Sequence, residues 1–371
     1  MNDNNLTISV ILPCRNEEQA LAYCINQINE VFTKHKINGE IIVSDSSTDN
    51  SPNIAKQLGA RLIKHDQEGY GRAFQEGFKV AQGQYIFMAD ADGTSDFNEV
   101  PNFIKYLDQG YDLVIGNRLQ GNIEKNAMPW LHRYFGNPAL SFLLRLFFSS
   151  PVADAHSGMR AIRRSSLSLL NLRTTGMEFA SEMIIKATQE KLKIKELPIN
   201  YHQRQGVSKL KSFSDGWRHL RFMLMFAPNY LFLIPGVLLV ILGLVLIVLF
   251  IDHVVYGCFL VIVGYQIFSL GIFSKTYMKS AGFIKQDKIV DFLARVIKFE
   301  TGIFLGVIFL FLGLLVQLDF VFDFLQLNLG IPPNSIILIV LTLAIIGIQT
   351  MFFSFLISIL LVEKNEDSNF S

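Results

Sequence analysis

Four long apolar runs constrain this chain more than any other feature of its sequence. They cover residues 231–251, 254–274, 301–318 and 336–362, and none of them contains a charged side chain. A helix needs roughly 18 to 20 apolar residues to cross the hydrocarbon core of a bilayer, so each run is close to or above the length of a membrane span. The 371 residues are 50% hydrophobic and only 18% charged, which excludes an ordinary soluble protein.

The charges beside these runs predict how the chain crosses the membrane. Lysine and arginine gather before the first run and between the second and third, whereas segments 252–253 and 319–335 carry only acidic full charges. Because basic loops stay on the cytoplasmic side, the first domain and both termini are expected in the cytosol. The start, MNDNNLTISV, lacks the basic and apolar regions of a signal peptide, which agrees with this orientation. The basic residues are Arg204, Lys209, Lys211, Arg218 and Arg221, then Lys275, Lys279, Lys285, Lys288, Arg295 and Lys298.

The three cysteines, Cys14, Cys24 and Cys258, show no metal-binding spacing. In a reducing compartment such scattered cysteines are packing residues rather than disulfides. We therefore expect no structural role for them beyond packing.

The first 215 residues alternate between short apolar runs and helical patterns. This order predicts an α/β domain with a mostly parallel sheet and helices on both faces. Ligands of such open sheets bind where the strands end. The predicted strands are 8–13, 40–45, 60–65, 84–90 and 111–117, and the predicted helices include 17–34 and 70–82.

Two aspartates, Asp90 and Asp92, follow the buried run YIFM and precede Gly93. Residues i and i+2 at a strand end point to the same side, so both carboxylates reach one bound cation. Oxygen ligands without nearby His or Cys suit Mg²⁺ or Mn²⁺. A simple Asp-Gly turn is the alternative reading of the same residues.

Four blocks of the chain together resemble a known family. VILPCRNEE, IIVSDSSTDNSP, GYGRAFQEGFKVAQGQYIFMADADGTSD and DAHSGMRAIRRSSL are similar, in this order, to the motifs of family 2 glycosyltransferases with a GT-A fold. Within that family the resemblance is to the polyprenyl-phosphate (dolichyl-phosphate) glycosyltransferase type, over roughly residues 6–215. It implies an inverting, metal-dependent transferase that uses a nucleotide-sugar donor.

The resemblance also implies roles for individual residues. The donor would be bound by Pro13, Arg15, Glu17, Val43, Asp45, Asp90 and Ala91, and the metal by Asp92 with Asp90. The residues implied in catalysis are Asp92, Asp90, Arg118 and Asp154, with Arg118 near the donor phosphates or the acceptor.

The chain departs from the family pattern at three points. Ser44, Asp45 and Ser46 stand where many relatives have two adjacent acids, and Thr94 stands where some have a glutamine metal ligand. The chain contains no Q-x-x-R-W motif, which argues against a processive polysaccharide synthase.

A basic segment, RQGVSKLKS at 204–212, lies just before the first apolar run. It predicts an acceptor that carries a phosphate. Arg204, Lys209 and Lys211, with Arg118, would bind the phosphate of a polyprenyl phosphate, whose charged oxygen needs no general base. Contact with lipid headgroups is the alternative role of these cations. A hydroxyl acceptor would need a base, and His156 or Asp154 in DAHSGMR are the candidates near a recognisable block.

Segment 128–148, MPWLHRYFGNPALSFLLRLFF, mixes aromatic residues with Arg133 and Arg145 and is interrupted by Pro138. This pattern predicts a pair of interfacial helices in the headgroup region, with a buried amphipathic helix as the alternative. Glu178 and Glu182 fall on one helix face, so either one points into the site or both are solvated. GYGR at 69–72 is expected to be a helix entrance rather than a phosphate loop.

Together these features predict a GT-A domain at 1–215 followed by an all-α membrane domain of four helices at 216–371. The predicted function is transfer of one sugar from a nucleotide sugar to polyprenyl phosphate at the cytoplasmic face, in an integral protein of a bacterial inner membrane. Expected partners are the nucleotide sugar, the lipid and the membrane, with no nucleic acid, and a homo-oligomer stays open. The alternatives are a lipid hydroxyl acceptor and, in another class, a transporter or flippase with a nucleotide-binding domain. Charge-free spans argue against transport, because substrate pathways usually need polar groups inside the membrane.

Overall fold

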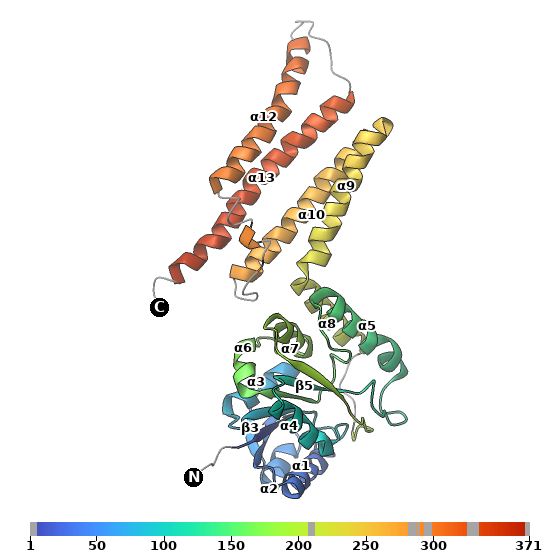
Figure 1. The fold of residues 1–371 in the computed structure, drawn as a ribbon, viewed down its shortest axis with the longest axis vertical. Helices are drawn as coiled ribbons and strands as arrows, with labels where there is room; N and C mark the ends of the chain where they lie inside the picture. The colour runs from blue at the N-terminus through green and yellow to red at the C-terminus, as the bar shows by residue number, and fades with distance from the viewer. Residues whose placement is uncertain are drawn as a thin grey trace. The chain divides into compact units, whose positions relative to one another are not determined.

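The computed structural model describes residues 6–206, 212–280, 287, 290–292, 299–324 and 334–367. Its chain divides into two units, Met1–Met225 and Phe226–Ser371. Figure 1 shows an α/β unit and a helical unit, which are treated separately below. The alternation of strands and helices predicted for the first unit is confirmed.

The first unit is built on one seven-stranded sheet of order β3-β2-β1-β4-β6-β5-β7. All strand pairs are parallel except those of β6, which runs antiparallel to β4 and β5. The strands are β1 (Ile8–Cys14), β2 (Gly39–Asp45), β3 (Arg61–Lys64), β4 (Tyr85–Met88), β5 (Leu113–Asn117), β6 (Arg160–Arg163) and β7 (Ile194–Pro198). The sequence predicted the first five of these strands and missed β6 and β7.

Alternation of side chains along the strands assigns the helices to the two faces of the sheet. Val10 and Leu12 of β1 join the hydrophobic core formed with helices α1 (Leu21–His35) and α4 (Val100–Asp108). Ile11 points the other way and contacts Gly77 of α3 (Tyr70–Val80), where a Cβ would lie 2.6 Å from Ile11. Helix α3 then packs on α7 (Phe179–Gln189), with Phe74 stacked on Phe179 at 5.5 Å between ring centroids.

The structure describes further helical elements in this unit. They are α2 (Ser51–Gln57), η1 (Phe97–Glu99), η2 (His132–Gly136), α5 (Asn137–Phe148), α6 (Arg164–Leu170) and α8 (Ser212–Phe226). Helix α3 begins at Tyr70, so GYGR is the helix entrance that the sequence predicted.

Segment 130–148 folds as one continuous helical stretch rather than as two helices. Its middle, η2, is a π-turn in which the Asn137 N–H donates to the carbonyl of His132. Pro138 follows at the start of α5 and has no N–H to donate, so a wider turn accommodates it without a break. The aromatic side chains of this stretch are exposed, among them Trp130 (65%), Tyr134 (58%) and Phe135 (59%). Ser141 and Leu144 on the other face of α5 are buried, so the position of this segment in the headgroup region stays a prediction.

The second unit consists of long apolar helices. They are α9 (Ile234–Leu249), α10 (Val254–Ser280), α12 (Phe299–Phe324) and α13 (Asn334–Asp367). The π-turn η3 (Asn229–Leu233) precedes α9, and the short 3₁₀ turn η4 (Ile251–His253) joins α9 to α10. Within the described residues, three stretches have the length and apolarity of a membrane span: Asn229–Leu249, Val254–Ser280 and Asn334–Leu360. In α12 the apolar stretch Glu300–Leu314 is shorter than the other three, so the fourth predicted span stays a prediction.

Glycines bring α9 and α10 into close contact. A Cβ at Gly243 would lie 2.6 Å from the carbonyl oxygen of Gly257, and one at Gly264 would lie 2.8 Å from that of Gly236. Small residues at such interfaces let helix backbones approach inside a membrane, where burial of apolar surface gives no driving force for association.

Candidate active site

The carboxyl ends of β1, β2, β4 and β5 meet at one edge of the sheet, and the predicted site residues follow them. In the register of the sheet, Cys14 pairs with Asp45, and β4 runs parallel to β1. Asp90 and Asp92 follow β4, and Arg118 follows β5. The fold therefore brings together residues that the sequence could only place one strand at a time.

Asp45 is completely buried at the end of β2, and within the described part of the chain neither of its carboxylate oxygens has a hydrogen-bond partner. Buried acceptors without donors are costly, so such a group indicates a site for a ligand that donates hydrogen bonds. The neighbouring Ser44 hydroxyl lies 3.2 Å from Nε2 of His65. This geometry suits the role in donor binding that was predicted for Asp45.

The loop after β1 is tied to the loop after β2. The Asn16 N–H donates to the Ser47 hydroxyl (2.7 Å), and the Asn16 side chain accepts from the Thr48 N–H (2.8 Å). Arg15 lies at the exposed rim and pairs with Glu68. Pro13 is half-buried. The side chains of Val43 and Ala91 belong to the hydrophobic core, so only their backbone can reach a ligand.

Asp92 is buried and bonded on both oxygens. Its Oδ1 accepts from the Thr94 N–H (3.1 Å) and hydroxyl (2.6 Å), and its Oδ2 accepts from Arg204 Nη1 (2.9 Å). Arg204 also donates to Glu17 Oε1 (2.5 Å). Arg204, which was predicted to bind the acceptor phosphate, bridges the two carboxylates in this structure. Lys209 and Lys211 lie outside the described residues.

Asp90 is surrounded by charged and polar groups. The Tyr70 hydroxyl donates to its carboxylate, and the side chains of Arg118 and Arg204 are close enough to lower its pKa. Burial and then the charge of Asp92 outweigh these effects and raise the pKa of Asp90 to about 7. Gly158 lies so close that any Cβ there would collide with the Asp90 carboxylate. Tyr70 is thus a site residue that the sequence reasoning missed, although GYGR marked its position.

Arg118 and Asp154 form a buried ion pair. Arg118 donates from Nε to Oδ2 (2.8 Å) and from Nη2 to Oδ1 (2.8 Å), and its own N–H reaches Oδ2 (3.0 Å). Burial acts to lower the pKa of Arg118, but Asp154 raises it above the usual value. The Arg118 guanidinium lies over the Tyr201 ring, 5.3 Å from its centroid. Asp154, predicted as catalytic, therefore holds Arg118 in place.

A small pocket beside this pair is lined by Asp90, Arg118, Ser157 and Tyr201, among others. In the described residues the hydroxyl of Ser157 is buried without a hydrogen-bond partner. Ser157 and Tyr201 were not predicted from the sequence. Tyr201 reaches the site because residues 201–205 run along the Asp90 loop, with the His202 N–H bonded to the carbonyl of Thr94.

The other sequence candidates lie outside this cluster or hold it together. His156 Nε2 lies 3.3 Å from the Ser181 hydroxyl, which lies 2.9 Å from Nδ1 of His219. Burial, and next the nearby His219, lower the pKa of His156 well below its usual value. Glu182 accepts the N–H groups of Arg173 and Thr174 and pairs with Lys186 at 2.7 Å, so it is a structural carboxylate.

The two aspartates also suit a divalent cation. Burial, and next the charge of Asp92, raise the pKa of Asp90, and a cation bound to both carboxylates would relieve the repulsion between them. Mg²⁺ and Mn²⁺ typically bind one or two carboxylates and take their other ligands from substrate phosphates and water. The described residues contain no cluster of three or more His, Cys, Asp or Glu that could hold a metal ion.

Comparisons with known proteins identify the family. Residues 9–170 match the model of glycosyl transferase family 2, and residues 272–361 match the family 2 C-terminal transmembrane region. The low-salt glycan biosynthesis hexosyltransferase Agl6 of Haloferax volcanii is 39% identical over 95% of this chain and 88% of its own length. A dolichyl-phosphate hexose transferase of the same organism is 31% identical over 56% of this chain and 89% of its own length.

Among solved structures, glucosyl-3-phosphoglycerate synthase from Mycobacterium tuberculosis, in complex with Mn²⁺ and UDP, is 22% identical and has a TM-score of 0.48. The match covers 60% of this chain and 80% of that one. This similarity is too low to assign a ligand here. The match to Agl6 over nearly the whole length of both chains, together with the two family models, shows that the protein belongs to glycosyltransferase family 2 and is a membrane glycosyltransferase.

Proposed function

We propose that the protein transfers one hexose from a nucleotide sugar to a polyprenyl phosphate at the cytoplasmic face of a membrane, with inversion at the anomeric carbon. The names of the two Haloferax relatives, a hexosyltransferase and a dolichyl-phosphate hexose transferase, support the sugar and the lipid. The family assignment replaces the alternative of a transporter.

The main support for a phosphate acceptor comes from the hydrogen bonds of Asp154. Both of its oxygens are bonded by Arg118, so the carboxylate that the sequence offered as a base is occupied. A polyprenyl phosphate is already ionised at neutral pH and needs no base, but it does need cations. Arg118 and Arg204 both lie close enough to Asp90 to affect its pKa, which places two guanidinium groups at the strand ends.

The residues at the strand ends would have different roles in the reaction. Asp45 and Glu17 would orient the nucleoside, and Asp90 and Asp92 would hold Mg²⁺ or Mn²⁺. When bound, the ion neutralises the negative charge that develops on the leaving diphosphate. Arg204 would exchange its bonds to Asp92 and Glu17 for bonds to phosphate, and Arg118 would fix the acceptor phosphate for in-line attack on the sugar carbon.

One observation favours the alternative of a lipid hydroxyl acceptor. The pKa of Asp90 is about 7, which suits a general base at neutral pH. In that reading Asp90, rather than Asp154 or His156, takes the proton from the hydroxyl.

The acceptor test is an incubation of the purified protein with a panel of sugar nucleotides, Mg²⁺ or Mn²⁺, and either polyprenyl phosphate or the matching polyprenol. We expect a lipid product with the mass of a hexosyl polyprenyl phosphate and little product from the polyprenol. Equal use of the polyprenol would replace the phosphate acceptor by the hydroxyl alternative. The anomeric configuration of the product, measured by NMR, decides between inversion and retention.

A further inference from the structure

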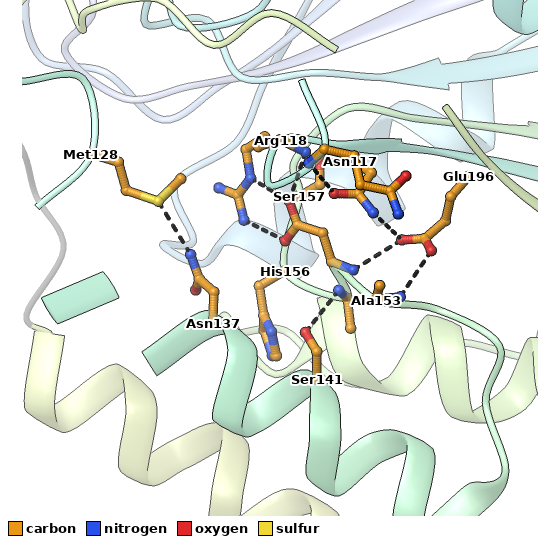
Figure 2. A network of polar contacts seen from close by, with 12 residues as sticks. Asn117, Arg118, Met128, Asn137, Ser141, Ala153, His156, Ser157 and Glu196 are labelled. Carbon is orange, nitrogen blue, oxygen red and sulfur yellow. Dashed lines mark hydrogen bonds and ion pairs between the residues drawn. The ribbon is translucent and has the colours of Figure 1, made fainter. Parts of the chain in front are cut away.

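Glu196 on β7 is a half-buried carboxylate that bonds three groups near the site. Its Oε1 accepts from the Asp154 N–H (2.9 Å) and from Asn117 Nδ2 (3.3 Å), and its Oε2 accepts from the Ala153 N–H (2.9 Å). Figure 2 shows these contacts between Glu196 and the loop that leads into β6. Glu196 therefore fixes the backbone at Ala153 and Asp154 against the end of β5.

The same loop determines where Arg118 points. The carboxylate of Asp154 accepts bonds from the backbone N–H, Nε and Nη2 of Arg118. A shift of the Asp154 backbone would move that carboxylate, and the guanidinium with it. Contacts thus run without a gap from Glu196 through Asp154 to Arg118, which lines the pocket beside Asp90.

The contacts at position 196 use both oxygens of the carboxylate. The N–H groups of Ala153 and Asp154 bond different oxygens of Glu196, and an amide would place an NH₂ group where one of these oxygens lies. Burial raises the pKa of Glu196, the two N–H bonds lower it, and the nearby charge of Asp154 raises it. Placing a second carboxylate beside Asp154 therefore has an electrostatic cost that an apolar residue at this position would avoid.

We propose that Glu196 is a positioning residue for Arg118, acting through the backbone of Ala153 and Asp154 to aim the guanidinium at phosphate. The inference rests on the proposed function, in which Arg118 binds the acceptor phosphate.

The test is a double-mutant cycle in the full-length protein between Glu196→Gln and Arg118→Lys. Glutamine keeps one acceptor oxygen but turns an NH₂ group toward one of the two backbone N–H groups. We expect Glu196→Gln alone to lower kcat/KM for the lipid acceptor roughly ten-fold, the effect of about one hydrogen bond in the transition state. The dissociation constant of the sugar nucleotide, measured by calorimetry, is expected to change much less.

The decisive result is the second arm of the cycle. Lysine at position 118 cannot make the forked bond to Asp154, so the position of that carboxylate no longer matters. In the Arg118→Lys background, Glu196→Gln should therefore cost less than about two-fold. An undiminished ten-fold loss in that background would show that Glu196 acts independently of Arg118 and would overturn the proposal.

Glu182→Gln is the matched control for a purely structural carboxylate. Glu182 is more deeply buried than Glu196 and likewise accepts two backbone N–H groups, but these come from Arg173 and Thr174 rather than from the Asp154 loop. Its loss should lower the thermal unfolding midpoint, and any loss of kcat/KM should add to that of Arg118→Lys. If Glu196→Gln does not fold, Glu196→Asp, which keeps the charge but withdraws it by one methylene, replaces it in the cycle under the same criteria.

The controls separate this proposal from the proposed function. If the wild type does not use polyprenyl phosphate, the proposed function is wrong, and the cycle is run with whichever acceptor is used. If Arg118→Lys is fully active, the role of Arg118 is wrong, and with it the positioning role of Glu196.

Discussion

At the scale of single residues, the site is a set of carboxylates, each with a different set of partners. Asp92 accepts hydrogen bonds from Arg204 and Thr94, and Glu17 accepts one from Arg204. Asp154 accepts its bonds from Arg118. Asp45, in contrast, is buried without a hydrogen-bond partner among the residues described. These differences predict different outcomes when each charge is removed.

Asp92→Asn removes the charge proposed to bind the metal while keeping the shape of the side chain. We expect turnover to fall by about a hundred-fold or more, the usual cost of losing one electrostatic group that stabilises the transition state. The thermal unfolding midpoint should fall, because the asparagine oxygen can still accept the bonds from Thr94 but its NH₂ group faces Arg204, which keeps only its bond to Glu17. Asp112→Asn is the control, since Asp112 bonds Ser166 and Lys193 at the other end of β5 and should affect stability alone. Turnover of Asp92→Asn near that of the wild type would exclude the metal role.

Asp45→Asn should change stability and donor binding in opposite directions. Removing a buried charge that lacks a partner is expected to leave the free energy of unfolding unchanged or to raise it by up to about 1–3 kcal/mol. The apparent KM for the sugar nucleotide should rise, because the carboxylate is assigned to the nucleoside. Denaturant unfolding and initial-rate kinetics measure the two effects. A less stable variant with unchanged donor KM would make Asp45 a structural residue.

At the scale of secondary-structure elements, the sequence predicted β1 to β5 and the entrance of α3 but not β6 or β7. The first five strands are buried apolar runs separated by helical patterns. Strands β6 and β7 instead carry arginine, lysine and glutamate, as in RAIR and IKELP. They are strands because β6 fills the gap between β4 and β5 and β7 extends the edge, so tertiary pairing overrides their local pattern.

Segment 130–148 exposes aromatic side chains beside cations, with Arg133 over the ring of Tyr134 at 5.4 Å. If it lies in the headgroup region, Trp130 should be quenched by lipids brominated near the headgroup. The measurement uses Trp217→Phe, because Trp130 and Trp217 are the two tryptophans of the chain. The same variant in vesicles without brominated lipid gives the reference intensity. The Trp130→Phe variant gives the emission of Trp217 alone. Unquenched emission from Trp130 would contradict the interfacial prediction.

At the scale of the whole molecule, the two units have separable tasks in the proposed function. Helix α8 belongs to the first unit, because its His219 bonds Ser181 of α7. A truncated form that contains the whole first unit should therefore end at Met225.

We expect the form ending at Met225 to bind sugar nucleotide with Mg²⁺ or Mn²⁺ and to use a short, water-soluble prenyl phosphate. It should lose most transfer to a long-chain polyprenyl phosphate, which stays in the membrane. Calorimetry measures the first property and product mass the second. Full activity of this form on the long-chain lipid would show that the second unit does not present the acceptor.

The sequence by itself determined the features that depend on neighbouring residues. Uncharged runs predict membrane helices, alternating strand and helix patterns predict the α/β unit, and Asp90-x-Asp92 after a buried strand predicts the position of the site. Each of these signals lies within one or two elements, so it can be read without knowing how distant segments meet.

Only the tertiary structure decided which residues pair within the site. Arg118 is bonded to Asp154, 36 positions away, and Arg204 to Asp92 and Glu17, 112 and 187 positions away. The sequence assigned Asp154 to catalysis and Arg204 to the acceptor phosphate, and these roles stay predictions, but it could not show that each side chain faces an opposite charge. Glu196 drew no notice for the same reason, since its partners Asn117, Ala153 and Asp154 reach it only once β7 pairs with β5. Ion pairs and hydrogen bonds act over a few ångströms in space, and sequence distance carries no information about them.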